Sequence, residues 1–318
     1  MVEKNRTFLF PGQGTQYQGM ALDFLAAGSA GVRELFVLAS KSMGRNMEAL
    51  LRDSDAETLR RSDIAQPAVT LANLAAAAFL GERGIRPAAC AGHSLGEYAA
   101  MVSAGVISPE DCFTLVRERG AAMQHAADRI REAGTGTVPG MAAVMGLPPE
   151  RVETLIAEWI AGGLEGLYAA NFNSPRQVVI SGTAEALAAA RERFKEAGAK
   201  RVLPLAVAGP FHSPLMAEAA EAFAPVLEEV HFKDPAIPLF SNVSGKRVFS
   251  GIEVKELALR QITGTVRWTS EEDAILALGT GAVLETGPGR VLQGLWKDRG
   301  SEIPCYAAGT VKDIEELV

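Results

Sequence analysis

Cysteine, clustered positive charge and long apolar runs are all scarce in this chain of 318 residues. Its three cysteines, Cys90, Cys112 and Cys305, are widely spaced, so the sequence indicates neither a disulfide framework nor a paired-cysteine metal site. We expect all three to be buried thiols. The net charge is -7 and no dense run of Lys and Arg occurs, which argues against a nucleic-acid-binding surface.

The longest apolar run, residues 71–80, is much shorter than the roughly 20 residues that a membrane span needs. The apolar stretch before Pro11 is also too short for the core of a signal peptide. We therefore expect a cytoplasmic protein with no membrane contact. With 48% hydrophobic and 22% charged residues, the chain can bury a large core in one large domain or in one domain with a smaller insertion.

Short apolar segments alternate with longer segments of helical period, which predicts an α/β fold with a mostly parallel sheet covered by helices. The glycine-rich segment 131–140 indicates a boundary. The pattern after it is β-α-β-β-α-β, the order of a ferredoxin-like unit. We therefore predict a main domain formed by residues 1–136 and 207–318, with an inserted subdomain at 137–206.

The sequence GHSLG at 92–96 places a glycine two positions to either side of Ser94. It matches G-x-S-x-G, in which a tight strand-to-helix turn presents the serine hydroxyl at the top of a sheet. The Leu95 amide would then lie at a helix N-terminus, where backbone donors are unpaired and negative charge is favoured. The preceding apolar strand and the following helical period favour a nucleophile. Serine is also a common helix N-cap, so both interpretations stay open on these residues alone.

A serine nucleophile needs a base, and the chain has four histidines. His93 adjoins Ser94, and neighbours on such a turn point apart. His125 is expected in the middle of a helix and His231 just past a helix end, where packing roles are more common. His212 lies in GPFHSPLM, a loop from which a side chain can reach the edge of a sheet. His212 is therefore the candidate base, and a structural role for it also stays open.

Seven motifs occur in one order along the chain: FLFPGQGTQYQGM, GHSLGEYAA, RERG, NFNSPRQVVISG, GPFHSPLM, RQITGTVRW and ETGPGRVL. This series resembles the malonyl-CoA:acyl-carrier-protein transacylases of fatty-acid synthesis and the related acyltransferase domains of polyketide synthases. The resemblance extends from about residue 7 to residue 295. It implies an α/β-hydrolase-like core with a ferredoxin-like insertion, in agreement with the element order above.

The resemblance also implies catalytic roles, position by position. Ser94 corresponds to the nucleophile and His212 to the general base. No acidic third member is expected, because in this family a backbone carbonyl near the glutamine that matches Gln261 orients the imidazole. The backbone amides of Gln13 and Leu95 would form the oxyanion hole.

The resemblance also implies five substrate-binding residues: Arg119, Phe211, Gln261, Asn171 and Asn173. Arg119 would bind the malonyl carboxylate, since a guanidinium binds a carboxylate bidentately. Phe211 would crowd a branched α-carbon and so favour malonyl over its methylated relatives. Asn171 and Asn173 would line the site, although turn chemistry between two strands is an open alternative. Thr265 departs from the pattern, because relatives commonly carry a proline there.

The implied enzyme is an S-malonyltransferase that moves a malonyl group from malonyl-CoA to the phosphopantetheine thiol of an acyl carrier protein. Neither a metal nor a cofactor is expected, since the coenzyme A thioester is the substrate. The family-level expectation is a monomer. The sequence does not separate fatty-acid synthesis from a free-standing acyltransferase of polyketide synthesis. Two other functions stay open: an acyl-carrier-protein thioester hydrolase on the same scaffold, and a non-catalytic module that binds carrier protein or acyl-CoA.

Overall fold

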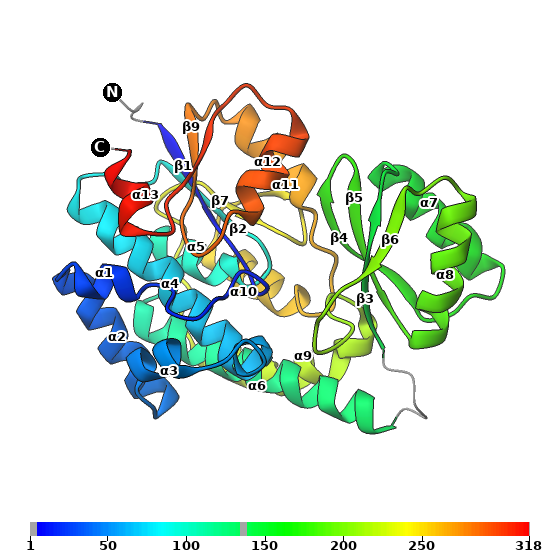
Figure 1. Cartoon of the computed structure of the whole chain (residues 1–318), viewed down its shortest axis with the longest axis horizontal. Coiled ribbons are helices and arrows are strands. Elements are labelled where there is room, and N and C mark those ends of the chain that lie inside the picture. The colour runs from blue at the N-terminus through cyan, green and yellow to red at the C-terminus, as the bar shows by residue number, and fades with distance from the viewer. Residues whose placement is uncertain (1–4, 134–138, 318) are drawn as a thin grey trace.

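The computed structural model describes residues 5–133 and 139–317, which form two sheets with their covering helices (Figure 1). The larger sheet has six strands in the order β10-β9-β1-β2-β7-β8. All neighbouring strands in it are parallel except β7 and β8. The predicted mixed α/β fold with a mostly parallel sheet is therefore present. The bounds of the strands are β1 Arg6–Phe10, β2 Ala89–Gly92, β7 Leu239–Ser241, β8 Lys246–Val248, β9 Ala282–Glu285 and β10 Cys305–Ala307.

Helices cover both faces of the larger sheet, because its central strands are apolar on both sides. Along β1, Phe8 and Phe10 belong to one buried cluster and Leu9 to another. Successive side chains of a strand point to opposite faces, so the two clusters lie on the two faces of the sheet. The helical elements of this unit are α1 Leu22–Ala26, α2 Ala30–Met43, α3 Met47–Asp53, η1 Thr58–Arg60, α4 Ser62–Glu82, α5 Gly96–Ser103, α6 Pro109–Ala133, η2 Pro214–Met216, α9 Ala217–Glu229, α10 Gly251–Arg260, α11 Trp268–Ala277, α12 Val291–Arg299 and α13 Val311–Glu315.

Helix α4 is long and apolar enough to cross a membrane by length and composition alone. This differs from the expectation drawn from the run at 71–80, because a helix tolerates scattered polar residues that interrupt an apolar run. However, 83% of the most apolar 18-residue stretch of this helix is buried inside the protein. The apolar surface of α4 is therefore used in the core of this fold.

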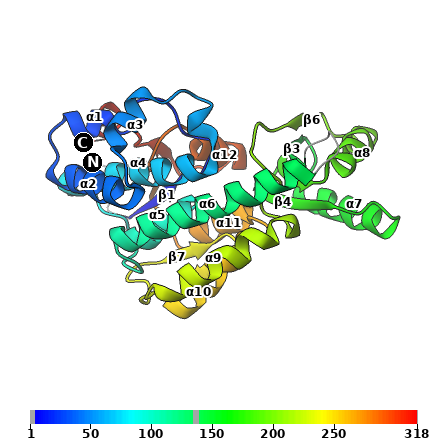
Figure 2. The same cartoon turned by 90° about the horizontal axis from the view of Figure 1, so that it is seen from below.

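The smaller sheet is antiparallel, with strands in the order β4-β5-β3-β6. The element order is β-α-β-β-α-β, as the sequence predicts, and a separate apolar cluster lies between this sheet and its two helices. Figure 2 shows that α6 runs along the larger unit and reaches this smaller one. The elements are β3 Gly140–Met145, α7 Pro149–Ala161, β4 Leu167–Ser174, β5 Gln177–Gly182, α8 Ala184–Glu196 and β6 Arg201–Pro204.

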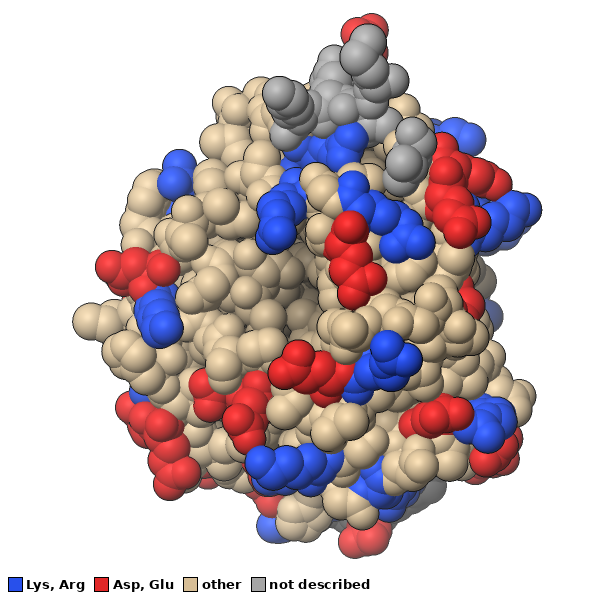
Figure 3. Space-filling view, turned by 90° about the vertical axis from the view of Figure 1, so that its left-hand side faces the viewer, with Lys and Arg blue, Asp and Glu red and all other residues tan. Residues whose placement is uncertain are grey.

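Some sequence-based expectations differ from the structure or lie beyond it. Cys90 and Cys112 are buried, but Cys305 is only partly buried because it lies on β10 at the edge of the larger sheet. The predicted boundary between residues 136 and 137 lies outside the described residues, so the division into domains stays a prediction. On the face that Figure 3 shows, Lys and Arg are interspersed with Asp and Glu and form no continuous basic surface.

Candidate active site

Ser94 lies on a turn between β2 and α5, at the carboxyl edge of the parallel strands. Its φ of 51° is left-handed, which is rare for a residue with a side chain. Both flanking glycines are required by close packing. A Cβ on Gly92 would lie 2.0 Å from the carbonyl carbon of Gly96, and a Cβ on Gly96 would lie 1.9 Å from the Phe10 oxygen. The GHSLG segment therefore forms the turn that the motif predicts.

The Ser94 hydroxyl contacts His212 and does not cap the helix. Its Oγ lies 2.8 Å from His212 Nε2. At the N-terminus of α5, no side chain accepts a capping hydrogen bond from the backbone. On the other side of the ring, Nδ1 lies 2.9 Å from the Gln261 carbonyl oxygen and 3.2 Å from that of Gly264. Because carbonyl oxygens only accept hydrogen bonds, Nδ1 carries the proton and Nε2 is free to accept the one on Ser94. The N-cap interpretation of Ser94 is therefore wrong.

His212 is buried in a way that keeps its ring neutral. Burial lowers its pKa to about 3, and the positive charge of Arg119 acts in the same direction. Hydrogen bonds to the carbonyls of Gln261 and Gly264 oppose the shift but do not overcome it. A neutral imidazole is the form that can accept a proton from a serine hydroxyl.

The other histidines are placed differently. His93 points away from Ser94, as predicted, and its Nε2 lies 2.9 Å from Asn173 Oδ1. Burial lowers the pKa of His93, and the ring packs edge-on against Trp268. His125 and His231 are exposed. His212 is thus the histidine with a ring nitrogen at Ser94 Oγ in the described part of the chain.

A cavity of about 380 Å³ opens beside Ser94, between the larger unit and the smaller sheet. Gln261 does not line it, because its side chain is buried behind the wall. In residues 5–133 and 139–317, no group of three His, Cys, Asp or Glu side chains is placed to hold a metal ion. The cavity walls include most of the residues that the resemblance singled out: Gln13, Ser94, Leu95, Arg119, Asn171, Asn173, Phe211 and His212.

Arg119 projects from α6 into this cavity, although the helix position alone would suggest a surface charge. The residue is 1% exposed. Its terminal nitrogens donate to the side-chain oxygens of Gln66 and Gln261, each at 2.8 Å. Burial lowers the pKa of the guanidinium, but arginine remains charged in proteins. Within the described residues no ion pair includes Arg119, so the cation can take an anionic ligand.

The asparagines lie on β4 rather than in a turn. Asn173 bridges His93 and Gln177, since its Nδ2 donates to Gln177 Oε1 at 2.9 Å. Asn171 forms a bridge to Val266 of the larger unit. The turn interpretation is therefore wrong, because β4 continues through both residues.

The loop after β1 packs directly on the serine turn. A Cβ on Gly12 would lie 2.4 Å from the His93 oxygen, so only glycine allows this approach. Gln13 follows in the same loop, and both Gln13 and Leu95 line the cavity next to Ser94. Neither backbone amide donates a hydrogen bond within the described part of the chain, which leaves both available to a ligand.

Several buried polar residues behind the turn were not predicted. Asn242 follows β7 and its Oδ1 accepts the Ser94 amide at 2.6 Å. Glu97 accepts the Asn242 amide at 2.6 Å and a hydrogen bond from the Gln261 side chain. Glu271 accepts from Asn242 Nδ2 at 2.7 Å. The network joins the serine turn to the glutamine that contacts Arg119.

Burial sets the charges of the two glutamates in this network. It raises the pKa of Glu97 to about 8, opposed by its hydrogen bonds and by Arg119. Burial raises the pKa of Glu271 well above its usual range, and the Glu97 carboxylate adds to that increase. Glu271 is therefore the member of the pair that holds a proton most firmly, which avoids two adjacent buried negative charges.

Known proteins resemble this chain in both sequence and fold. The acyl transferase domain family matches residues 7–314. The malonyl CoA-acyl carrier protein transacylase of Bacillus subtilis is 38% identical, over 97% of this chain and 94% of the relative. That of Escherichia coli K12 is 40% identical, over 91% of each chain.

Solved structures of proteins with the same activity in their names also match this chain. An acyl carrier protein S-malonyltransferase from Vibrio cholerae has a TM-score of 0.91 and 38% identity, and the match covers 99% of this chain and 100% of that one. A malonyl-transacylase solved in complex with a type II PKS acyl-carrier protein has a TM-score of 0.89 and 38% identity, over 98% of each chain. Because family, relatives and structures agree over nearly the full length, this chain belongs to the malonyl-CoA–acyl carrier protein transacylases of the acyl transferase family.

Proposed function

We propose that this protein transfers a malonyl group from malonyl-CoA to the phosphopantetheine thiol of an acyl carrier protein, through a malonyl ester of Ser94. The observation that carries the proposal is the 2.8 Å contact between Ser94 Oγ and His212 Nε2 in a cavity that also holds a buried arginine. The related transacylases support malonyl as the acyl group and an acyl carrier protein as the acceptor.

In the first step, His212 Nε2 takes the hydroxyl proton while Ser94 Oγ attacks the thioester carbonyl of malonyl-CoA. The amides of Gln13 and Leu95 stabilise the oxyanion that develops. The carbon–sulfur bond then breaks, and coenzyme A leaves with the proton from His212. The product is a malonyl-serine ester with a neutral imidazole beside it.

In the second step, His212 takes the proton of the phosphopantetheine thiol, and the thiolate attacks the malonyl-serine carbonyl. The ester bond breaks, and Ser94 recovers its proton from His212. The carbonyls of Gln261 and Gly264 orient the imidazole. A carboxylate is therefore not needed for that role. Ping-pong kinetics follow from this order of steps.

Selection of the acyl group depends on Arg119 and Phe211. The terminal nitrogens of Arg119 each have a second N–H, so the guanidinium can bind the free malonyl carboxylate bidentately. Phe211 is buried in the cavity wall, where it would crowd a substituent on the α-carbon. Such steric selection is worth only roughly 1–3 kcal/mol, so it would be incomplete.

The first experiment is intact mass spectrometry after brief incubation with malonyl-CoA alone, followed by addition of phosphopantetheinylated acyl carrier protein. We expect a malonyl adduct on the enzyme that moves to the carrier. Ser94→Ala should form no adduct, whereas Ser103→Ala, on α5 but outside the cavity, should behave as wild type. An adduct that decays to free malonate without loading the carrier would indicate a hydrolase, and no adduct would indicate a binding module.

We further infer a cytoplasmic monomer with a core of the α/β-hydrolase kind and an insertion at 137–206. The serine on a strand-to-helix turn at the carboxyl edge of a parallel sheet supports that kind of core. The separate apolar cluster of the smaller sheet supports the insertion. The pathway served is either fatty-acid or polyketide synthesis.

A further inference from the structure

The catalytic cavity has two arginines, and none of its lining residues is acidic. Arg119 is the buried one, described above. The other is Arg60 in η1, which is exposed. Arg60 and Ala206 also line two further cavities, of about 440 and 420 Å³, that adjoin the catalytic one. Arg60 therefore lies at the mouth, where the catalytic cavity opens to the surface.

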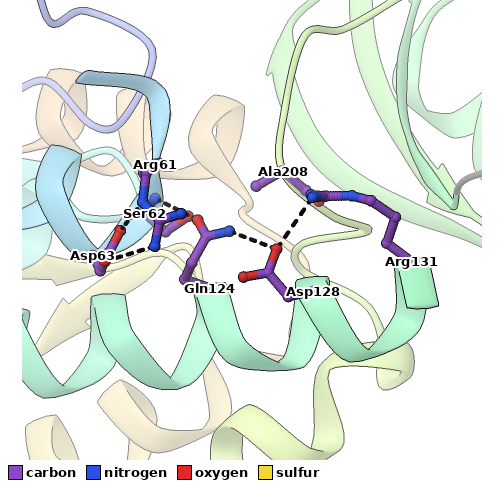
Figure 4. A network of polar contacts seen from close by, with 7 residues as sticks. All are labelled: Arg61, Ser62, Asp63, Gln124, Asp128, Arg131 and Ala208. Carbon is purple, nitrogen blue, oxygen red and sulfur yellow. Dashed lines mark hydrogen bonds and ion pairs between the residues drawn. The ribbon is translucent and has the colours of Figure 1, made fainter. Parts of the chain in front are cut away.

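The arginines near Arg60 already have partners. Arg61 pairs with Asp63 at 2.9 Å, and Arg131 pairs with Asp128 at 3.2 Å. Figure 4 shows how Gln124 joins these pairs, since it accepts from the Ser62 amide and donates to Asp128. By contrast, no ion pair within residues 5–133 and 139–317 includes Arg60. Its guanidinium is the cation at the mouth that is free to bind an anion.

The backbone of Arg60 is held at a fixed position relative to the reacting serine. Gln13, which lines the cavity with Ser94, donates from its side chain to the Arg60 carbonyl at 3.3 Å and to Ser62 Oγ at 3.2 Å. Asp55 accepts the Thr58 amide at 2.8 Å and so caps the turn that carries Arg60. A cation with a long side chain on a fixed backbone can bind one end of a substrate whose other end is at Ser94.

Both substrates of the proposed reaction have this shape. In each, the reacting thiol or thioester is at one end of a pantetheine arm and a phosphate is at the other. Malonyl-CoA thus has an anionic carboxylate beyond the thioester and an anionic phosphate at the far end of the arm. The cavity has one arginine for each, and Leu205, Val207 and Val291 supply partly exposed apolar surface for the methylene and methyl groups of the arm.

We propose that Arg60 binds the phosphate of the phosphopantetheine arm, both when the arm belongs to coenzyme A and when it belongs to the acyl carrier protein. This inference rests on the proposed function, because it takes its two substrates from it. It assigns to an exposed arginine a contact that is independent of the acyl group and shared by both half-reactions.

The test compares substrates with and without the phosphate. For acylation, kcat/KM is measured with malonyl-CoA and with malonyl-pantetheine. For deacylation, it is measured with phosphopantetheinylated carrier protein and with free pantetheine as acceptors. Arg60→Ala should lower kcat/KM about three- to tenfold for both phosphate-containing substrates, the range expected for an exposed charge-assisted hydrogen bond. It should leave both phosphate-free reactions unchanged, and Arg60→Lys should recover most of the loss.

Arg61→Ala is the matched control, because it removes the same charge from the next residue, whose guanidinium is paired with Asp63. It should change none of the four rates. The proposal is overturned if Arg60→Ala lowers the rates equally with and without phosphate, if it changes none of them, if Arg61→Ala has the same effect, or if only malonyl-CoA is affected. A wild-type protein that forms no malonyl-serine would instead contradict the proposed function itself.

Discussion

Arg119 is a buried cation whose hydrogen-bond partners are two amide oxygens rather than a carboxylate. Burying a charge without a counter-charge is costly, so a fold keeps such a group when a ligand completes it. Glu97 interacts with it only at longer range, through Gln261. In the proposed function, the carboxylate of the malonyl group supplies this missing counter-charge.

Arg119→Ala should lower kcat/KM for malonyl-CoA about 10- to 150-fold, the loss expected for a hydrogen bond to a charged group. The value for acetyl-CoA should not fall, because acetyl has no carboxylate to bind. Rates of enzyme acylation on a panel of acyl-CoA esters check this. Arg117→Ala is the control on the same helix, since Arg117 donates to the Ser42 carbonyl and lies outside the cavity. Unchanged selectivity in Arg119→Ala would make the residue structural.

The neutral state of His212 should appear in the pH dependence of acylation. Because its pKa in the folded enzyme is about 3, kcat/KM should stay level from about pH 8 to pH 5, although a free imidazole titrates near 6.5. Single-turnover acylation with malonyl-CoA measures this profile. A decline with an apparent pKa near 6.5 would show that the base is solvated or is another group.

The same pKa difference predicts how His212 affects folding stability. Below about pH 6.5 the unfolded chain takes up a proton at this residue and the folded protein does not. Above that pH both states hold a neutral ring, so the folded protein keeps the full stabilising contribution of His212. It is lost progressively as the pH falls from about 6.5 toward 3.

Single functional residues could be predicted from the sequence when they lie in local motifs. Those whose partners are far away in the chain could not. Ser94 and its glycines could be read from five consecutive letters. Asn242, which accepts the Ser94 amide, is 148 residues away in the chain. Gln66 could have been noticed as a polar residue in the apolar helix α4, but its partner on α6 depends on how the two helices pack. Such contacts are set by tertiary structure and not by spacing.

Among the elements, the turn between β2 and α5 leaves no space for a side chain at its glycines. Gly96→Ala would place a Cβ 1.9 Å from the Phe10 carbonyl oxygen, and backbone on both sides cannot move cheaply. We expect a loss of about 3 kcal/mol or more in the free energy of unfolding, at the upper end of overpacking effects. Urea denaturation monitored by circular dichroism measures it.

The control for that substitution is Gly294→Ala in α12. Nothing lies within 4 Å of a Cβ at this position, and the residue is exposed inside a helix. It should therefore gain about 0.5–1 kcal/mol, since alanine favours helix over glycine. Equal and small effects at the two positions would mean that the serine turn is not packed as the structure has it.

Long periodic helices and the strands of the smaller sheet were predicted from sequence because their apolar patterns extend over enough residues. Strands β8 and β10, with three residues each, and helix α13, with five, were not predicted. Segments of this length contain too few residues to show a period of 2 or 3.6. Helix α11 was also missed, because its buried residues include Glu271 and Glu272, which read as a surface pattern.

Across the whole molecule, backbone hydrogen bonds hold the smaller unit against the larger one at the cavity. Phe172 donates to the Val266 carbonyl and Val266 donates to the Ala170 carbonyl, each at 2.8 Å. Thr265, where a proline was expected, adds a bond from its hydroxyl to the Ala169 carbonyl at 2.7 Å. The cavity walls thus come from two units whose edges are joined by main-chain contacts.

Binding of malonyl-CoA should therefore stabilise both units together. In Ser94→Ala, which cannot react, ligand at 100 times its Kd should add about 2.7 kcal/mol to the free energy of unfolding. Hydrogen exchange followed by mass spectrometry should show added protection in peptides of β1–β2 and also in those of β3–β5. Coenzyme A without an acyl group is the control and should protect less. Protection confined to one unit would contradict a shared site.

Ser94 and His212 have φ values of 51° and 56°, and Ala21 is the other non-glycine residue with positive φ in the described part of the chain. A left-handed backbone with a side chain costs roughly 1–3 kcal/mol, and glycine relieves that cost. Replacing His212 by glycine would relieve this strain but would leave the Gln261 and Gly264 carbonyls without their hydrogen-bond donor. The two strained residues are also the pair joined by the 2.8 Å contact, so the backbone strain lies where the proposed chemistry takes place.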